Sequence, residues 1–231
     1  MAGTDDSPAP RLRPGVIAFD VNETLLDLAP VRAALVELGQ PEHLLSTVFA
    51  RTLLTGFAAT VTGDWCRFRD AFDAALAQAS DLDETERSRV ADTFGELVPH
   101  PDVEPALRRL AEAGIPAVTL SHGSPGVAEA ALERGGLSGL VVRTMSSESI
   151  HAWKPAREAY LWAAGSCDVV PERMALVAAH GWDVHGAQRA GLTGAWFPRR
   201  ERCYPAVYEP AHVEAASLAG AIEGLLALPD A

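Results

Sequence analysis

The residue with the most informative chemistry is Asp20, which stands directly after a short apolar run, VIAF, at residues 16–19. Such a run predicts a buried strand. A carboxylate at the end of a buried strand lowers stability unless it is paired or used. In open sheets of alternating strands and helices, ligands bind at the carboxyl ends of the strands. We therefore expect Asp20 to be the chemical centre, where a carboxylate can act as a nucleophile.

Further polar side chains should reach the same edge of the sheet. They are Thr24 beside Asp20, Ser121 and His122 after residues 115–120, Lys154 before a helix, and His180 and Asp183 after residues 174–178. An anionic nucleophile needs a nearby cation to stay ionised and to hold an anionic substrate, and Lys154 can supply it. Asp183 can fix the lysine through an ion pair. The Ser121 hydroxyl and the backbone N–H groups of the next turn can hold a second anionic group.

The elements that position these residues form two blocks. After residue 98 strands and helices alternate, with strands expected at 115–120, 140–143, 174–178 and 194–197. This alternation predicts an α/β fold with a doubly wound parallel sheet and right-handed crossovers. Residues 30–97 show only helical spacing, so we expect a helical cap inserted after the first strand. The expected division is a flexible tail at 1–14, a core domain at 15–29 and 98–231, and the cap domain at 30–97.

Composition limits the partners and the location. The chain has 231 residues, a formal net charge of −12 and 48% hydrophobic residues, as expected for a soluble globular protein. The negative charge argues against nucleic acid or an anionic membrane as partner, whereas local cations still allow a small anionic substrate. The 3 cysteines lack metal spacing, and no signal peptide or apolar run of about 20 residues is evident, which favours a cytoplasmic protein. Apolar faces of the cap and the last helix could pair two copies in a homodimer.

The segments FDVNETLLD, TLSHGSP, WKPAREAY and VAAHGWDVHGAQRAG, taken in order, resemble the four motifs of the haloacid dehalogenase superfamily of hydrolases. The resemblance covers almost the whole chain, and that family carries its α-helical cap where residues 30–97 lie. It implies a Rossmann-like core and a covalent aspartyl ester formed on Asp20. One departure in the first motif is Glu23, where the family customarily has glycine.

Two positions separate the branches of this superfamily. Its phosphatases carry a general-acid aspartate two residues after the nucleophile, and an acidic Mg²⁺ ligand four residues before the aspartate of the last motif. Here these positions are Asn22 and Ala179. A hard cation would have too few carboxylates, so Mg²⁺-dependent phosphoryl transfer is disfavoured. The chain resembles instead the type II 2-haloacid dehalogenases, which work without metal or cofactor.

By that resemblance, Asp20 displaces the halide of a small 2-haloalkanoic acid, and water then hydrolyses the ester. Thr24, Ser121 and Lys154 would hold Asp20 and the substrate carboxylate. Tyr160 and Asp183 would support Lys154 or the water. The other residues expected to contact substrate are Asn22, His122, Gly123, Trp182 and Arg51. The cap would close over an apolar pocket and exclude bulk water during the first step.

The leaving-group side departs from the family pattern. The family's asparagine after the second-motif serine is His122 here, and its serine and asparagine in the last motif are Ala178 and His180. The halide-binding arginine of the cap has Arg51 as a candidate, although a shift of two residues would place Phe49 there. Since imidazole titrates near neutrality, we expect His180 to be the general base for ester hydrolysis.

Other functions stay open on the sequence alone. They are an Mg²⁺-dependent phosphatase acting on a small phosphate ester, a hydrolase of another small electrophilic carboxylate, and a catalytically weak relative that only binds a carboxylate or a protein partner. A metal held by His122 and His180 would lack a third ligand at a recognisable spacing. Halide release without metal would separate the dehalogenase from the others.

Overall fold

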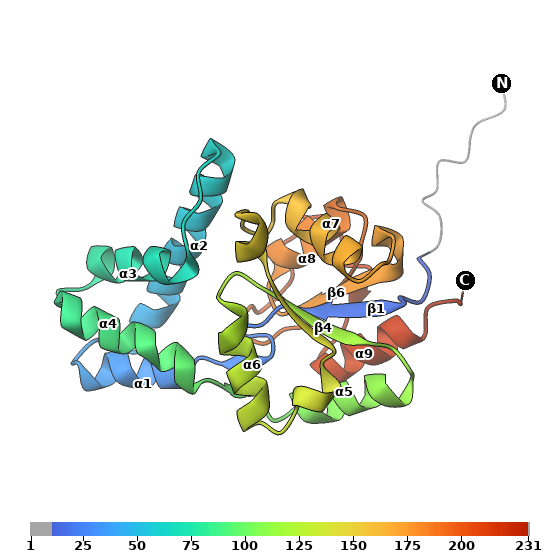
Figure 1. Ribbon diagram of the computed structural model, residues 1–231, viewed down its shortest axis with the longest axis horizontal. Coiled ribbons are helices and arrows are strands. Elements are labelled where there is room, and N and C mark those ends of the chain that lie inside the picture. Colours follow the sequence, from blue (N-terminus) through green and yellow to red (C-terminus); the bar gives the residue numbers. More distant parts are fainter. Residues whose placement is uncertain (1–10, 231) are drawn as a thin grey trace.

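A computed structural model describes residues 11–230, and its core is a six-stranded sheet in the order β5-β4-β1-β6-β7-β8 (Figure 1). All neighbouring strands pair in parallel. The strands are β1 (Val16–Phe19), β4 (Ala117–Ser121), β5 (Arg143–Ser146), β6 (Met174–Ala178), β7 (Thr193–Trp196) and β8 (Val213–Glu214). The predicted α/β fold with a doubly wound parallel sheet is therefore confirmed. Its strands all point the same way, so the segments after β1, β4 and β6 meet at one edge.

Helices cover both faces of this sheet (Figure 1). One face carries α5 (Val103–Glu112), α6 (Pro125–Arg134) and α9 (Leu218–Leu226), and the other carries α7 (Arg157–Ser166) and α8 (Gly181–Arg189). Successive side chains of a strand point to opposite faces. In β1, Ile17 and Phe19 accordingly pack in one apolar cluster and Val16 and Ala18 in the other. Burial on both faces explains why β1 is a continuous apolar run.

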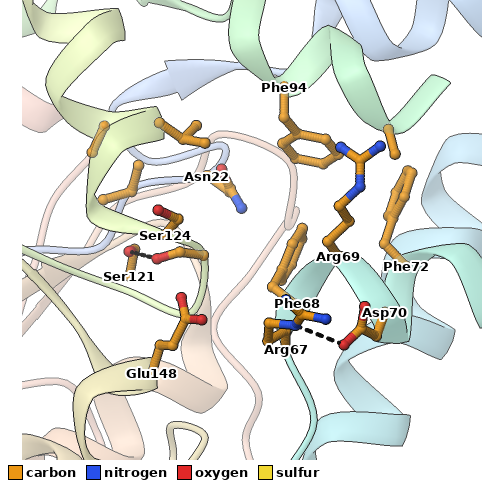
Figure 2. A pocket seen from close by; sticks show the side chains of 15 residues that line it. Asn22, Arg67, Phe68, Arg69, Asp70, Phe72, Phe94, Ser121, Ser124 and Glu148 are labelled. Atoms are coloured by element: carbon orange, nitrogen blue, oxygen red, sulfur yellow. Dashed lines mark hydrogen bonds and ion pairs between the residues drawn. The ribbon is translucent and has the colours of Figure 1, made fainter. Parts of the chain in front are cut away.

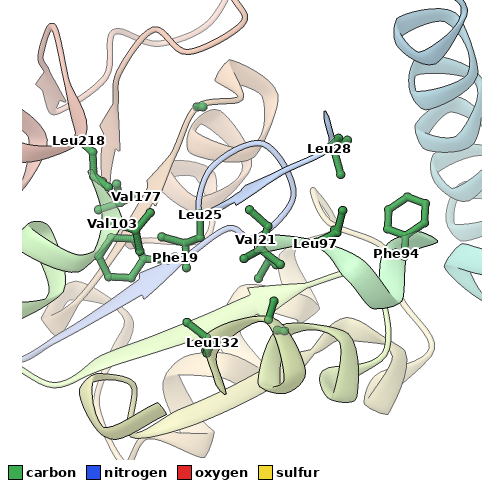
Figure 3. Packing of buried hydrophobic residues seen from close by; sticks show 14 of the residues in the cluster. Phe19, Val21, Leu25, Leu28, Phe94, Leu97, Val103, Leu132, Val177 and Leu218 are labelled. Carbon is green, nitrogen blue, oxygen red and sulfur yellow. The ribbon is translucent and has the colours of Figure 1, made fainter. Parts of the chain in front are cut away.

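Four helices form a cap, which lies beside the sheet (Figure 1). They are α1 (Ala29–Glu37), α2 (Leu44–Thr62), α3 (Phe68–Ala79) and α4 (Glu84–Asp92), followed by a 3₁₀ turn at Thr93–Glu96. Two short strands, β2 (Leu26–Asp27) and β3 (Val98–Pro99), pair antiparallel where the chain enters and leaves the cap. Apolar side chains continue from the sheet through this crossing into the cap, as Phe19, Val21, Leu28, Leu97 and Phe94 show in Figure 3.

The strand predicted at residues 140–143 needs correction, because the structure places β5 at Arg143–Ser146. The apolar residues that suggested the strand lie instead in and after a 3₁₀ turn at Ser138–Leu140, and Val142 is exposed. β5 is an edge strand, and only its last two residues, Met145 and Ser146, are buried. An edge strand that buries so little carries no clear apolar alternation, so the sequence pattern does not locate it.

From the sequence we found no apolar run of about 20 residues, and helix α2 requires a correction on this point. Among the described residues, it is long and apolar enough to cross a membrane by length and composition alone, with 19 residues and a mean hydropathy of 1.4. It packs against α1 and α3 through one face, which includes Leu45, Val48 and Leu53. Leu54 and Val61 on the same helix are exposed. The expected homodimer stays a prediction.

The beginning of the chain was expected to be a flexible tail over residues 1–14. Residues 1–10 of that segment lie outside the described residues. Of the remainder, Arg11 donates a hydrogen bond to the Gly191 carbonyl at 3.1 Å, and Arg13 donates one to the Leu226 carbonyl at 2.9 Å. The chain is therefore attached to the core from residue 11 onward.

Candidate active site

Asp20 and Lys154 form a buried ion pair at the carboxyl edge of the sheet. Asp20 follows β1, Lys154 lies in the loop before α7, and Lys154 Nζ is 2.9 Å from Asp20 Oδ1. The lysine side chain is 0% exposed and the aspartate side chain 9%. Nζ also donates to the Leu120 carbonyl at 2.8 Å and to Asp183 Oδ2 at 2.6 Å. An ammonium has three protons, so these contacts fix the lysine completely.

Tyr160 and Asp183 form the support behind this lysine. Asp183 lies in the first turn of α8, where the helix dipole favours a carboxylate. The Tyr160 hydroxyl donates to Asp183 Oδ1 at 2.6 Å, and both side chains are fully buried. Tyr160 therefore holds Asp183, and Asp183 positions Lys154.

The second oxygen of Asp20 has its own two partners. The Thr24 hydroxyl donates to Asp20 Oδ2 at 2.7 Å and accepts the Ala179 N–H at 3.0 Å. His180 Nδ1 lies 3.0 Å from the same Oδ2. Both residues predicted beside Asp20 are thus in direct contact with it. They are brought there because Thr24 lies in the turn after β1 and His180 in the turn after β6, the strand next to β1.

Burial and close charged partners determine the pKa values of Asp20, His180 and Asp183. Burial would raise the pKa of Asp20, but Lys154 and His180 outweigh it and hold that pKa below its usual range. Burial would lower the pKa of His180, but the hydrogen bond to Asp20 outweighs it and raises that pKa. Burial raises the pKa of Asp183 more than the Lys154 ammonium lowers it. Of the two carboxylates on Lys154, Asp20 is therefore the one held firmly as an anion.

An aromatic cluster lies over the lysine and His180. The His122 ring packs 4.5 Å from the Trp153 ring and 5.7 Å from the Trp182 ring, in the second case at only 9° between planes. Trp182 also lies 5.7 Å from the His180 ring and 5.8 Å from Lys154 Nζ.

His122 belongs to this cluster and is uncharged. Burial and the nearby Lys154 charge lower its pKa well below the usual value. His122 Nε2 lies 3.2 Å from the Lys154 backbone carbonyl, which can only accept, so this nitrogen carries the proton. The one donor of the neutral ring is therefore committed to positioning Lys154 rather than to a leaving group.

A cavity of about 620 Å³ opens between the core and the cap. Figure 2 shows Asn22, Ser121 and Ser124 on the core side, opposite Phe68 and Phe72 of α3. The cavity is lined by Val21, Asn22, Arg67, Phe68, Arg69, Asp70, Phe72, Ala91, Phe94, Ser121, Gly123, Ser124, Val127, Ala128 and Glu148. The cavity therefore reaches the two residues that directly follow Asp20, whereas Asp20 itself is not among the lining residues and its side chain is 9% exposed.

Ser121 and Gly123 line the cavity as a pair. The Ser121 hydroxyl donates to the Gly123 carbonyl at 2.8 Å, which shapes the turn between β4 and α6. Within residues 11–230, no group accepts a hydrogen bond from the backbone N–H of Gly123 or of Ser124. This turn can therefore offer free donors to an anion, as predicted from the sequence.

The structure corrects the placement of Arg51, which does not reach the site. Its guanidinium donates to the Gln78 carbonyl at 2.9 Å on the exposed side of α2. Two residues along a helix rotate a side chain by about 200°. Phe49 therefore faces inward instead, and its ring packs against His180 with 6.0 Å between centroids.

The cap arginines that do line the cavity are Arg67 and Arg69, which the sequence analysis missed. Arg67 pairs with Asp70 at 3.0 Å, as Figure 2 shows, and Arg69 pairs with Asp92 at 2.7 Å. They flank Phe68 at the start of α3, and the apolar stripe that begins with Phe68 was the available signal. Trp153 was also missed, although it directly precedes Lys154.

Comparison with known proteins gives a consistent set of relatives. A sequence model of the haloacid dehalogenase-like hydrolases matches residues 14–191. (S)-2-haloacid dehalogenase 1 of Pseudomonas sp. (strain CBS-3) is 30% identical over 181 residues, which cover 75% of this chain and 80% of the relative. (S)-2-haloacid dehalogenase H-109 of Pseudomonas putida is 26% identical over 191 residues, 80% of this chain and 85% of the relative. The crystal structure of one L-2-haloacid dehalogenase superposes with a TM-score of 0.85 at 26% identity, and the match covers 92% of this chain and 98% of that one.

Proposed function

Since the chain belongs to the haloacid dehalogenase-like hydrolases, as its four motifs predicted, we propose that it removes the halogen of a small 2-haloalkanoic acid by hydrolysis. The observation that carries this proposal is the buried Asp20 carboxylate, kept ionised by Lys154 at 2.9 Å. The names of the relatives, (S)-2-haloacid dehalogenases, support the substrate class.

The first step is a displacement at carbon. An oxygen of Asp20 attacks C2 of the substrate, the carbon–halogen bond breaks, and its electron pair leaves with the halide. The product of this step is an ester between Asp20 and the substrate carbon. Lys154 keeps the carboxylate anionic before attack, and burial under the cap removes the water that would weaken it as a nucleophile.

The second step is hydrolysis of that ester at the carboxyl carbon of Asp20. Water adds to this carbon, the bond to the ester oxygen breaks, and a 2-hydroxy acid leaves with an oxygen that came from Asp20. The water oxygen restores the carboxylate. We assign the removal of the water proton to His180, whose Nδ1 is 3.0 Å from Asp20, so that its Nε2 is the nitrogen left to act as a base. Esterification removes the negative charge that raises the pKa of His180, so the ring releases its Nε2 proton to solvent and can then accept the water proton.

The substrate carboxylate fits the turn between β4 and α6. Lys154 already uses its protons on Asp20, Asp183 and Leu120, so it is not free to bind the substrate directly. The Ser121 region with the N–H groups of Gly123 and Ser124 faces the cavity and supplies the donors. The alkyl part would then lie against the aromatic wall of α3.

We propose that the reaction needs no metal. The residues of this chain do not fit the ion that the phosphatase branch requires, because Asn22 and Ala179 replace its two carboxylates. Within residues 11–230, no group of three His, Cys, Asp or Glu side chains is arranged to hold a metal.

The proposal is tested with 2-chloropropionate in buffer containing EDTA. Chloride release is expected from the wild type and from the control Asp81→Asn, which alters an exposed carboxylate outside the cavity lining, and is expected to be lost in Asp20→Asn. Intact mass after rapid quenching should show a substrate adduct on the wild type. Phosphate release from a small ester only with Mg²⁺, without chloride release, would instead identify a phosphatase. Tight binding without turnover that survives Asp20→Asn would identify a binding protein.

A further inference from the structure

The two oxygens of Asp20 are bound unequally. Oδ1 accepts one hydrogen bond, from Lys154 Nζ at 2.9 Å. Oδ2 accepts one from the Thr24 hydroxyl at 2.7 Å and is 3.0 Å from His180 Nδ1. Because Thr24 also accepts the Ala179 N–H, its own proton points to Oδ2. Because an ionised carboxylate can only accept, His180 Nδ1 carries a proton in this contact.

This difference decides which oxygen can attack. A carboxylate oxygen has about two lone-pair sites in the carboxylate plane. On Oδ2 both are occupied by donors, whereas Oδ1 keeps one that no described residue fills. On the premise of the proposed function, we propose that Oδ1 attacks the substrate, and that His180 Nδ1–H and the Thr24 hydroxyl form an oxyanion hole for Oδ2 during ester hydrolysis.

The same contacts then serve both steps. After attack, Oδ1 is the ester oxygen and Oδ2 is the carbonyl oxygen, still between its two donors. When water adds to the carboxyl carbon, the carbonyl electron pair moves onto Oδ2, and donors at 2.7 and 3.0 Å meet that charge without moving. When the bond from the carboxyl carbon to Oδ1 breaks, the departing oxygen takes a proton from Lys154. Lys154 regains a proton from the carboxylic acid formed on Asp20. The proton that His180 took from water restores its protonated ring, so all of these residues return to their starting state.

His180 therefore has two separable parts. Nδ1–H binds Oδ2, and Nε2 is the base assigned above. In His180→Asn the side-chain amide nitrogen can occupy the place of Nδ1 while nothing replaces Nε2. In His180→Gln the amide reaches the place of Nε2 and the donor near Oδ2 is lost. His180→Ala loses both groups.

The experiment is rapid mixing of each variant with excess 2-chloropropionate, with chloride and intact mass measured over the first turnovers. Chloride should appear in a first-turnover burst in every variant, because Oδ1 and Lys154 are unchanged. The amount of ester that accumulates should be highest in His180→Ala and His180→Gln, lower in His180→Asn and lowest in the wild type. Hydrolysis in His180→Asn should exceed that in His180→Ala by about 10²–10³-fold, the usual effect of one oxyanion-hole donor. A purely structural role would lower the burst together with hydrolysis.

Equal hydrolysis rates in His180→Asn and His180→Ala would overturn the oxyanion role. Loss of the chloride burst in His180→Ala would overturn the assignment of Oδ1 as the attacking oxygen. If His180→Ala does not fold, Thr24→Val removes the other donor at nearly constant volume and should show the same pattern of burst and ester accumulation. Failure of the wild type to release chloride at all would overturn the proposed function instead, so the two failures are distinguishable.

Discussion

Replacing Gly56 with alanine tests how the cap positions the catalytic lysine. Gly56 lies on α2 directly against the Trp153 indole, and a Cβ at this glycine would come within 2.1 Å of Trp153 Cδ2. Ordinary carbon contacts are about 3.5–4.0 Å, so the ring and the helix must separate by roughly 1.5 Å. The indole cannot turn away freely, because its Nε1–H donates to the Cys66 carbonyl at 3.0 Å and its backbone N–H donates to Thr60 at 3.0 Å.

The size of the effect follows from two opposing terms. An added methyl group in a packed contact costs about 1–3 kcal/mol. Exchange of glycine for alanine inside a helix returns about 0.5–1 kcal/mol, so we expect a net loss of about 1–2 kcal/mol in the free energy of unfolding. Trp153 directly precedes Lys154, whose Nζ is 2.9 Å from Asp20. A displacement of about 1 Å at a catalytic group can lower the rate by about 10²-fold.

The assay combines urea unfolding with kcat/KM for chloride release. The matched control is Gly165→Ala in α7, where a Cβ would meet no atom within 4 Å. The control should be unchanged or slightly more stable, and fully active. If Gly56→Ala behaved like Gly165→Ala in both stability and rate, the contact between α2 and Trp153 would not position the lysine, and the reasoning would be refuted.

The remaining predictions each concern a single side chain. Tyr160→Phe leaves a buried carboxylate oxygen without its donor and should lower the free energy of unfolding by about 1–3 kcal/mol. Tyr204→Phe should be nearly neutral in the same denaturation experiment, since its hydroxyl is buried without a partner among the described residues. Glu23 has a left-handed backbone with φ of 63°, so Glu23→Gly should be about 1 kcal/mol more stable than Glu23→Ala, and the reverse order in urea would contradict backbone strain there. Burial lowers the pKa of His180, but the hydrogen bond to Asp20 outweighs it and leaves that pKa above 6.5. The protonated ring therefore stabilises the folded state below about pH 6.5, and this contribution is lost as the pH rises through the folded pKa. The stability advantage of the wild type over H180N should accordingly shrink between about pH 5 and pH 9, and an advantage that grows over this range would argue against the protonated ring.

The core of the site could be predicted from the sequence because strand ends are easy to locate. An apolar run fixes a buried strand, and parallel strands place their carboxyl ends at one edge. This reasoning brought Asp20, Thr24 and His180 together, and the structure places both partners on Oδ2 of Asp20. It also paired Lys154 with Asp183, which lie 2.6 Å apart between Nζ and Oδ2.

The cap could not be predicted to the same depth because its orientation depends on contacts far apart in sequence. Helical spacing identified α2, but the face of α2 that meets the core includes Gly56 against Trp153, a contact between residues far apart in sequence. A shift of two residues along the helix changes which side chain faces inward. The sequence therefore suggested Arg51 for a position that Phe49 occupies in the structure. Arg67 and Arg69 could not be predicted for a related reason. They line the cavity only because the start of α3 lies over it, and the sequence does not show where α3 lies.

The chemistry of Asp20 could be predicted from the sequence only in part. The motifs identify which side chains surround the carboxylate, but the assignment of one donor to Oδ1 and two to Oδ2 depends on distances of 2.7–3.0 Å set by the packed fold. Because Lys154 and Thr24 hold the same oxygens whatever stands at position 180, a change at that position leaves the attacking oxygen in place and alters the hydrolytic step. It follows that relatives with the same aspartate, threonine and lysine but another residue at the place of His180 should differ mainly in how long the ester persists.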